Sequence, residues 1–336
     1  MTLEEEQFTK WLKRPTIFIA NSWFLLASAG QSIVGYIVAF IAQILALFGA
    51  GLSSEALVHT ANAAYEIGIL AIPVIWYAST NEGVDQSMRL NPPRLSAMLY
   101  AAVAAFAGVL MVSNIGTWWM MLIESLGGQL YASNIPIPTT LNELTTSILL
   151  VGVIPGVCEE LFFRGALMGA WERRGSKIAL IITSALFAML HGSIMGLPTQ
   201  LMMGFVLGYC VLITDSLYVG MVYHTIHNST TLILTYLSMQ SMDAAAEYAS
   251  VASQVAAAGG MVTLAVQTVI SIGMFAAAMM LLVRSQTGRG MKLEKITDGE
   301  ADKTPMTWQE LLVLIAGLLT VGIAYMNDLM RVCGGV

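Results

Sequence analysis

The chain has 336 residues, of which 57% are hydrophobic and only 11% are charged, and its formal net charge is −6. A soluble domain carries about 25% charged residues, so this composition and a mean hydropathy of +0.73 exclude a soluble globular protein and indicate an integral membrane protein. The small negative charge gives no sign of nucleic-acid binding. Three isolated cysteines without a CxxC pair argue against a disulfide framework or a cysteine-based metal site.

Residues 1–16 are predicted to form an interfacial segment rather than a cleaved signal peptide. The charged leader contains three adjacent glutamates, and the apolar run behind it is far longer than a signal-peptide core of roughly 7–15 residues. The run Phe8–Arg14 combines Phe and Trp with Lys and Arg, which is typical of a helix at the membrane surface. We therefore interpret it as a simple anchor.

The apolar segments that follow predict an all-α fold, a polytopic membrane helix bundle of about eight to nine transmembrane helices. A spanning helix needs about 20 mostly apolar residues. The segments that approach this length are 17–48, 57–77, 97–123, 141–171, 178–193, 199–214, 217–239, 261–283 and 308–325. The fifth and sixth are short, so their limits are the least defined.

Lysine and arginine gather on one side of this predicted bundle. Cytoplasmic loops are enriched in both residue types. If the segments alternate, the basic residues lie before the first segment, after the second, after the fourth and between the eighth and ninth. The opposite loops (Gly51–Ala56, Ser125–Thr140 and Gln240–Gly260) contain none, and Arg331 is the one basic residue on that side. This pattern predicts a cytoplasmic N-terminus and an outer C-terminus.

The fourth segment carries three ionisable side chains within six residues: Glu159, Glu160 and Arg164. An ionised group at the bilayer centre costs roughly 2.5–3.5 kcal/mol, so such groups generally mark function or pair with one another. Glu160 and Arg164 are four residues apart on one helix face, which predicts a supporting ion pair. Glu159 points about 100° away around the helix, so it is free to act as a general base. The plainer interpretation is that both glutamates only bind the arginine and stabilise helix packing.

Three further polar residues reach a comparable depth on other predicted helices. At 1.5 Å per residue, Glu159 and His191 each lie about 20 Å from the same membrane face. His224 and Asn228 lie about 10–17 Å from that face. One cluster would satisfy all four groups, whereas polar groups facing lipid would stay unsatisfied. Each histidine taken alone is more often a packing residue.

His224 and Asn228 are four residues apart, so both can point at one bound atom. Side-chain donors aimed at a carbonyl oxygen form an oxyanion site. His191 could orient a water molecule beside Glu159. A metal site is the alternative, because Glu159, His191 and His224 could hold zinc or another divalent ion with one open water position. No HExxH helix is present and Asn is a poor zinc ligand, so a site without a cofactor is favoured.

The strings that carry these residues resemble a known family. EExxxR (Glu159–Arg164), FxxxH (Phe187–His191) and HxxxN (His224–Asn228) follow one another on successive predicted helices. This order resembles the CPBP family of intramembrane proteases, which includes the type II CAAX prenyl endopeptidases and lysostaphin-resistance-like proteins. The likeness covers roughly Leu141–Tyr236, under a third of the chain.

The resemblance implies a multi-helix bundle with an intramembrane catalytic cavity. Carried over by position, the roles it implies are water activation for Glu159 and His191, oxyanion binding for His224 and Asn228, and support for Glu160 and Arg164. Members have been described both as metalloproteases and as glutamate-type proteases, so the catalytic type stays open. The predicted parts of the chain are 1–16, an interfacial segment; 17–140, N-terminal transmembrane helices; 141–240, core helices of the catalytic type; and 241–336, C-terminal transmembrane helices with a cytoplasmic linker.

We therefore expect an intramembrane CAAX-type endopeptidase that hydrolyses a peptide bond of a membrane-associated protein or peptide. Its expected partners are that substrate and the lipid bilayer, without nucleic acid, and its expected location is a bacterial or archaeal cell membrane. One alternative is an ion-coupled transporter, because buried charges also mark transport pathways. Another is a non-proteolytic scaffold or immunity protein that uses the same cavity. The inverted repeats that would favour a transporter are not recognisable in the sequence.

Overall fold

The computed structural model describes residues 14–81, 88–131, 135–241, 250–286 and 304–334. Within these ranges every regular element is a helix, which confirms the all-α class and the polytopic membrane bundle. Most of the interfacial segment predicted for 1–16, and most of the polar linker before the last helix, lie outside the described residues. A short helix, α13 (Val251–Ala257), precedes the eighth predicted segment.

The elements follow the predicted segments closely. In chain order they are α2 (Ile17–Leu47), α3 (Ser54–Tyr65), η1 (Glu66–Ala71), α4 (Ile72–Thr80), α6 (Leu95–Ser125), α7 (Leu141–Ser147), η2 (Ile148–Val153), α8 (Ile154–Glu160), η3 (Leu161–Leu167), α9 (Met168–Trp171), η4 (Glu172–Arg174), α10 (Ser176–Leu190), α11 (Leu197–Thr214), α12 (Leu217–Ser241), α13, α14 (Gly260–Gln286) and α15 (Trp308–Val332). Among the described residues, seven helical rods are long and apolar enough to cross a membrane: 17–47, 54–80, 95–125, 141–174, 197–214, 260–286 and 308–332. Of the other two predicted segments, α10 is short, and α12 has 25 residues with polar side chains in its middle.

Helix starts follow local sequence signals. The hydroxyls of Thr16, Ser53 and Thr140 each accept a hydrogen bond from a backbone N–H in the first turn of the helix that follows. Thr307 forms a capping box with Glu310, in which each side chain accepts from the backbone N–H of the other residue. These caps satisfy donors that the helix itself leaves free, so the boundaries are set locally.

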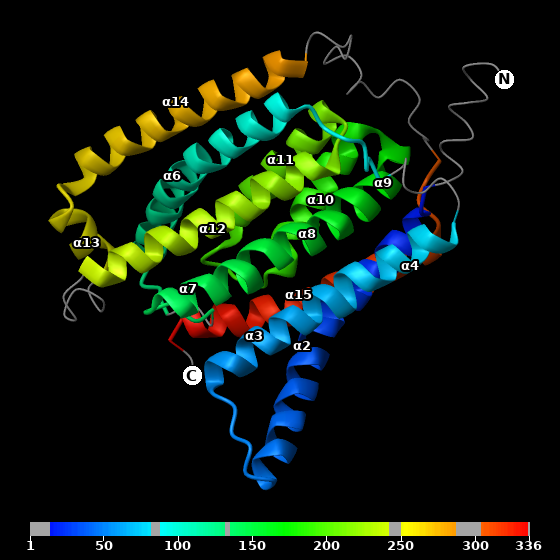
Figure 1. Cartoon of the computed structure of the whole chain (residues 1–336), viewed down its shortest axis with the longest axis horizontal. Coiled ribbons are helices and arrows are strands. Elements are labelled where there is room, and N and C mark those ends of the chain that lie inside the picture. The colour runs from blue at the N-terminus through cyan, green and yellow to red at the C-terminus, as the bar shows by residue number, and fades with distance from the viewer. Residues whose placement is uncertain (1–13, 82–87, 132–134, 242–249, 287–303, 335–336) are drawn as a thin grey trace.

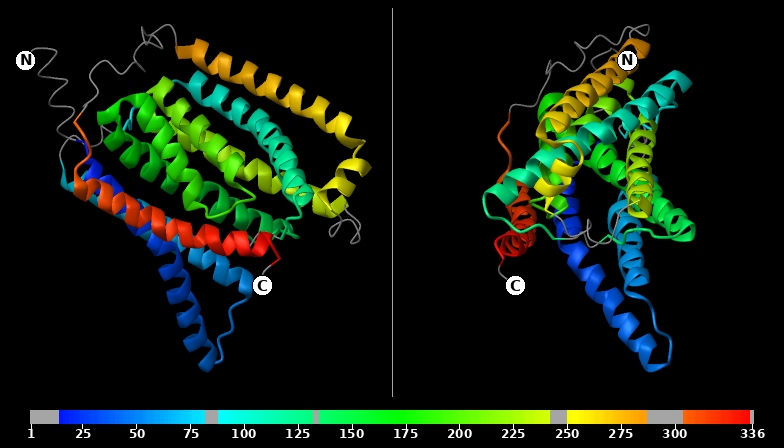
Figure 2. Two further views of the ribbon diagram at one scale, coloured as in Figure 1. Left: turned by 180° about the vertical axis from the view of Figure 1, so that it is seen from behind. Right: turned by 90° about the vertical axis from the view of Figure 1, so that its left-hand side faces the viewer.

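The bundle has two outer edges around a central group of helices (Figures 1 and 2). Helices α6 and α14 pack side by side along one edge, and α2 packs against α15 along the other. Between them lie α8, α10, α11 and α12. The buried face of α6 presents small residues such as Ala101, Ala104 and Ala105, none of which is exposed. Small side chains let neighbouring helices approach closely, which is how membrane helices gain packing energy.

The helix that carries the paired glutamates is not uniform. Residues 141–174 run as one rod in which α8 is flanked by two π-helical segments, η2 and η3. Pro155 lies inside this rod, in the first turn of α8, and has no N–H to donate to the preceding turn. A third π-helical segment, η1, interrupts the second rod directly after α3. π-turns are rare and frequently occur at functional sites.

The connection between α10 and α11 lies within the bundle rather than at its surface. Helix α10 has 15 residues and rises about 22 Å, less than the roughly 30 Å of a hydrocarbon core. The backbone of Ile194 is held by protein groups. Its N–H donates to Asp328 at 2.6 Å, and its carbonyl accepts from the Trp119 indole at 2.8 Å. The predicted fifth segment extended to Ser193, and the observed helix stops earlier because this loop is fixed by neighbouring helices instead.

Opposite that loop, basic side chains gather at one end of the bundle, which we call the basic end. Its members are Arg14, Arg89, Arg94, Arg173, Arg174, Lys177 and Arg284. Glu172 binds both Arg14 and Arg89 there, each at 2.8 Å. Among the described residues, only Arg164 and Arg331 are lysines or arginines that lie elsewhere.

Candidate active site

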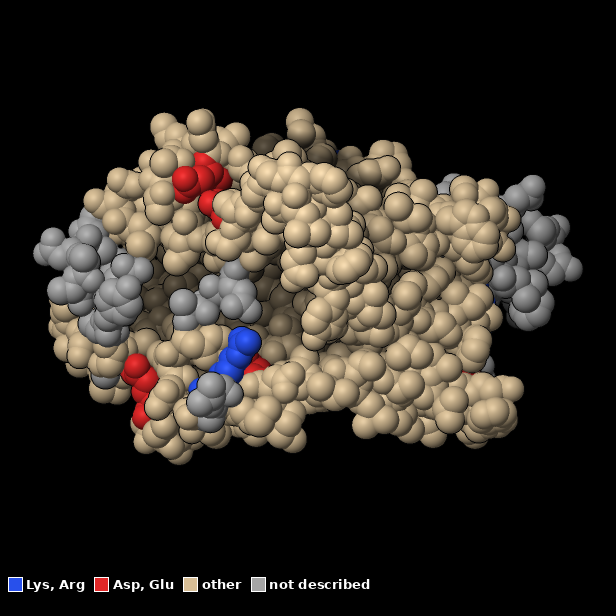
Figure 3. Space-filling view, turned by 90° about the horizontal axis from the view of Figure 1, so that it is seen from below, with Lys and Arg blue, Asp and Glu red and all other residues tan. Residues whose placement is uncertain are grey.

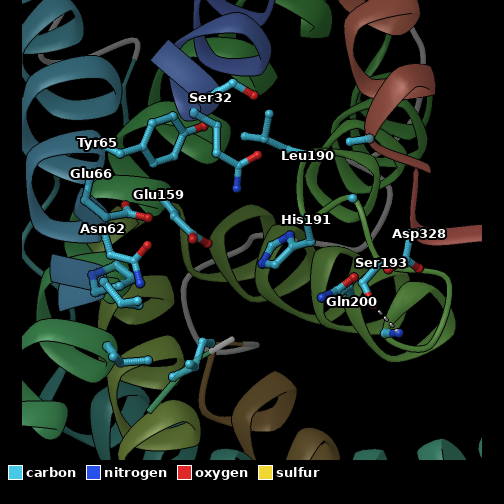
Figure 4. A pocket seen from close by; sticks show the side chains of 18 of the residues that line it. Ser32, Asn62, Tyr65, Glu66, Glu159, Leu190, His191, Ser193, Gln200 and Asp328 are labelled. Carbon is cyan, nitrogen blue, oxygen red and sulfur yellow. Dashed lines mark hydrogen bonds between the residues drawn. The ribbon is translucent and has the colours of Figure 1, made fainter. Parts of the chain in front are cut away.

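A cavity of about 790 Å³ opens between helices from both halves of the chain. Its walls come from α2, α3 with η1, α8, the loop between α10 and α11, α12 and α15. Figure 4 shows polar side chains projecting into this space from several of these elements. In Figure 3 the molecule is hollowed towards its left-hand end, beside a small group of Lys or Arg atoms on an otherwise largely uncharged face.

Glu159 forms part of the cavity wall from the last turn of α8. Its side chain is 13% exposed, and in Figure 4 its carboxylate points into the open space. Among the described lysines and arginines, none forms an ion pair with it, so the carboxylate is not consumed by a structural salt bridge. Glu159 is the residue for which the sequence predicts the role of general base.

Glu160 and Arg164 form the ion pair that their spacing predicts. Arg164 Nη1 lies 2.9 Å from Glu160 Oε1, and its Nη2 donates to the Gly204 carbonyl at 3.0 Å. The guanidinium also lies over the Phe187 ring, 4.5 Å from its centroid. Both charged side chains are essentially unexposed, so their attraction is barely screened by water.

His224 joins the two glutamates. Its Nδ1 lies 3.0 Å from Glu160 Oε1, and its Nε2 lies 3.8 Å from Glu159 Oε2. The ring is 3% exposed and is not part of the cavity wall in this arrangement. The sequence predicted that His224 and Asn228 would face one bound atom together, whereas here His224 faces carboxylates.

Glycines bring α12 close enough for these contacts. A Cβ on Gly152 would lie 2.7 Å from Ser229 Oγ, and one on Gly156 would lie 2.9 Å from the Thr225 backbone nitrogen. On the other side of the contact, a Cβ on Gly220 would lie 2.8 Å from Glu160 Oε2. No side chain larger than hydrogen fits at these positions without separating the helices, so the glycines set the depth at which the polar residues meet.

His191 lies directly after α10 and faces the cavity. Its Nδ1 is 2.8 Å from the Phe187 carbonyl oxygen, and a carbonyl can only accept, so Nδ1 carries the hydrogen in this pairing. When the imidazole is neutral, Nε2 is therefore the acceptor. In Figure 4 the ring stands across the open space from Glu159. A water molecule between the two would meet a carboxylate on one side and an imidazole acceptor on the other.

Asn228 lines the cavity from α12. Its Nδ2 donates to the Val151 carbonyl of the π-helical segment η2 at 3.2 Å, a long bond. The Asn228 amide is therefore a hydrogen-bond donor in the wall of the same cavity that Glu159 and His191 face. The adjacent histidine, His227, is buried and stacks on Tyr223 with ring centroids 6.1 Å apart.

The proposed metal ligands do not assemble. Among the described His, Cys, Asp and Glu side chains, no group of three or more is arranged to hold a metal ion. Glu159 and His224 are neighbours, but His191 lies on the opposite wall of the cavity. The His191 Nδ1 is hydrogen-bonded to the Phe187 carbonyl at the end of α10. As the described residues are placed, these three side chains do not form a His-His-carboxylate centre.

Sequence reasoning missed two acidic residues at this site. Glu66, from the second rod, is 7% exposed and projects into the cavity close to Glu159. Asp328, from α15, accepts from Tyr131 and from the Ile194 N–H, so it anchors the loop that follows His191. Glu66 was detectable, because an ionisable residue in an apolar span is unusual in itself. Asp328 was not, because it lies beyond the end predicted for the last helix.

The comparisons with known proteins bear on the segment that carries most of this site. Residues 141–230 match the family model described as type II CAAX prenyl endopeptidase Rce1-like. We call this matched segment the Rce1-like domain. The Rce1-like domain contains all six predicted site residues: Glu159, Glu160, Arg164, His191, His224 and Asn228. No curated protein and no solved structure matches the chain at a significant level.

The Rce1-like domain points, at the level of the family, to an intramembrane CAAX-type endopeptidase, and it does not favour a transporter. Together with the apolar helices it indicates an integral multi-pass membrane protein. The domain supplies only part of the cavity. The walls formed by α2, α3, η1 and α15, including Glu66 and Asp328, come from outside it.

Proposed function

We propose that the chain is an intramembrane endopeptidase that hydrolyses a peptide bond of a membrane-associated protein or peptide. The observation that carries this proposal is the placement of Glu159 and His191 on facing walls of one cavity within an Rce1-like domain. A carboxyl group and an imidazole nitrogen on facing walls of one cavity suit the activation of water for attack on a carbonyl. The cavity volume is within the range that holds a short peptide segment or small ligand.

The chemistry assigned to each residue follows from its contacts. Glu159 takes a proton from the attacking water, and His191 orients that water through Nε2. Asn228 is a wall donor that can turn from the Val151 carbonyl to the oxyanion that forms. His224 lies between the two glutamates, 3.8 Å from Glu159 Oε2 and 3.0 Å from Glu160 Oε1, so it positions the carboxylate that acts as base. Glu160 and Arg164 hold His224 and the helices in place.

The test of this function is the substitution Glu159→Gln, which keeps the shape and removes the base. Peptide termini would be compared in membranes and medium from cells that lack the protein, carry it, or carry the variant. Glu143→Gln, the same change at a half-buried position of the same rod outside the cavity wall, is the matched control. A terminus that needs both the protein and Glu159 establishes proteolysis and gives the cleavage site. Identical profiles with folded proteins would favour a transporter or a binding scaffold instead.

We propose that the cavity opens away from the basic end and therefore away from the cytoplasm. Its wall includes Tyr131, in the loop before α7, and Asp328 and Arg331, in the last turns of α15, which lie at the end of the bundle opposite the basic end. Phe163, another wall residue, still lies about 16 Å along its helix from the basic end. Because basic residues favour the cytoplasmic side, the scissile bond would be presented from the outer side of the membrane.

A native cysteine tests this orientation. Cys333 is exposed at the mouth end of α15, while Cys158 and Cys210 are buried. A membrane-impermeant maleimide added to intact cells is expected to label the protein, and Cys333→Ser is expected to abolish the label. Labelling that appears only after the membrane is permeabilised would contradict the proposed orientation.

A further inference from the structure

Glu66 is a buried acidic residue in the cavity wall that has no role in the proposed reaction so far. It begins η1, the π-helical segment of the second rod, and lies outside the Rce1-like domain. Its side chain is 7% exposed, and its Oε2 atom has no hydrogen-bond partner although it lies in the wall of the cavity. A buried carboxyl oxygen without a partner is costly, so its retention calls for a specific role.

The nearest polar partner of Glu66 is the carboxyl group of Glu159. Figure 4 shows the two side chains approaching from neighbouring walls, and the Oε2 atom of each is buried without a hydrogen-bond partner. Two carboxylates offer only acceptors, so a hydrogen bond between them requires a proton on one of them. In the part of the chain that the structure describes, no lysine or arginine forms an ion pair with either group. Two negative charges this close and this buried would repel each other strongly, which also favours one shared proton.

We propose that Glu66 and Glu159 form a two-carboxyl catalytic pair that holds one proton, with Glu159 as the base and Glu66 as the acid. This inference rests on the proposed endopeptidase function and adds a catalytic residue from outside the Rce1-like domain. Peptide hydrolysis needs such an acid, because an amide nitrogen leaves readily only when it is protonated. Two other donors at the wall are already engaged. The Tyr65 hydroxyl donates to the Ala27 carbonyl at 3.2 Å, and the His191 Nδ1–H to Phe187.

The step balances within the pair. Glu159 accepts a proton as the water oxygen bonds to the carbonyl carbon, and the carbonyl π electrons move onto its oxygen. The carbonyl then re-forms as the C–N bond breaks, and the nitrogen takes the proton of Glu66. The pair then holds its single proton on Glu159, and transfer along the hydrogen bond restores the starting state. One water is consumed and one carboxyl and one amine are produced.

Kinetics of three variants test the pair. Glu66→Gln preserves the shape and a donor towards Glu159 but has no proton to transfer, so kcat should fall about 100-fold or more while KM stays within a few-fold. Glu66→Asp keeps an acid on a shorter side chain and should recover part of that loss. Glu55→Gln makes the same change near the start of α3, outside the cavity wall, and should keep wild-type kcat. Wild-type kcat in Glu66→Gln would overturn the proposal, as would equal losses in the Gln and Asp variants.

A second readout does not depend on turnover. Infrared spectra of the purified wild-type protein should contain the carbonyl-stretch band of a protonated carboxyl that disappears in Glu66→Gln and persists in Glu55→Gln. The absence of any such Glu66-dependent band would overturn the shared proton even if the protein is a protease. Conversely, if the band is present and no peptide is cleaved, the carboxyl pair stands and the endopeptidase function fails. The two proposals can therefore fail separately.

Discussion

The buried ion pair between Glu160 and Arg164 makes a quantitative prediction about stability. Arg164 is 1% exposed and donates to Glu160 at 2.9 Å and to the Gly204 carbonyl at 3.0 Å. Arg164→Met keeps much of the apolar length but leaves the Glu160 carboxylate buried without its cation. Breaking a buried pair from one side costs about 3–5 kcal/mol, which lowers the folding equilibrium constant by roughly two to nearly four orders of magnitude.

The assay is equilibrium unfolding in mixed micelles with an increasing fraction of a denaturing detergent. Arg331→Met is the matched control, because the same substitution at an exposed position should change the unfolding free energy by no more than about 0.5 kcal/mol. The double variant Glu160→Gln with Arg164→Met removes both charges. Its loss should be smaller than the sum of the two single losses by about 1–3 kcal/mol. Additive losses would refute the claim that the two side chains act as a pair.

Two further predictions concern the groups that position the site. Gly156→Ala places a methyl group against the backbone of α12 and should cost about 1–3 kcal/mol of unfolding free energy and reduce cleavage. Gly273→Ala, where a Cβ meets nothing within 4 Å, should be nearly neutral in the same measurements. Asp328→Ala removes the acceptor of the Ile194 N–H, so the loop after His191 should loosen and kcat should fall about tenfold or more without a comparable loss of folded protein. Unchanged kcat in Asp328→Ala would show that the loop does not depend on this anchor.

The sequence predicted the helices well because the membrane imposes a simple rule. Every backbone polar group must be satisfied within the segment, so long apolar runs become helices with few alternatives. The rod from Leu141 and the helix from Leu217 begin at the predicted residues. The rule is weaker for α10, whose length depends on Asp328 and Trp119 holding the following loop from distant helices. Such contacts between residues far apart in the sequence leave no periodic pattern of apolar residues.

The candidate site also has one part that the sequence could predict and another part that it could not. The Glu160–Arg164 pair follows from spacing on one helix, so it could be predicted before any tertiary contact was known. The direction in which His224 faces could not, because it depends on how close three glycines let α12 approach α8. The carboxyl pair of Glu66 and Glu159 joins residues 93 positions apart (159 − 66). Each glutamate alone signals a costly buried charge, but only the fold shows that they meet.

Helix α2 links the site to the thickness of the bilayer. Its 31 residues extend about 46 Å, well beyond a hydrocarbon core of roughly 30 Å, so it must tilt or protrude. Its buried residues end at Gly30, and beyond that point it leans away from the bundle, as Figure 2 shows. Gln31 and Ser32, at this divergence, form part of the cavity wall. A helix with surplus length adjusts its tilt as lipid thickness changes, so one wall of the cavity moves with the lipid composition around it.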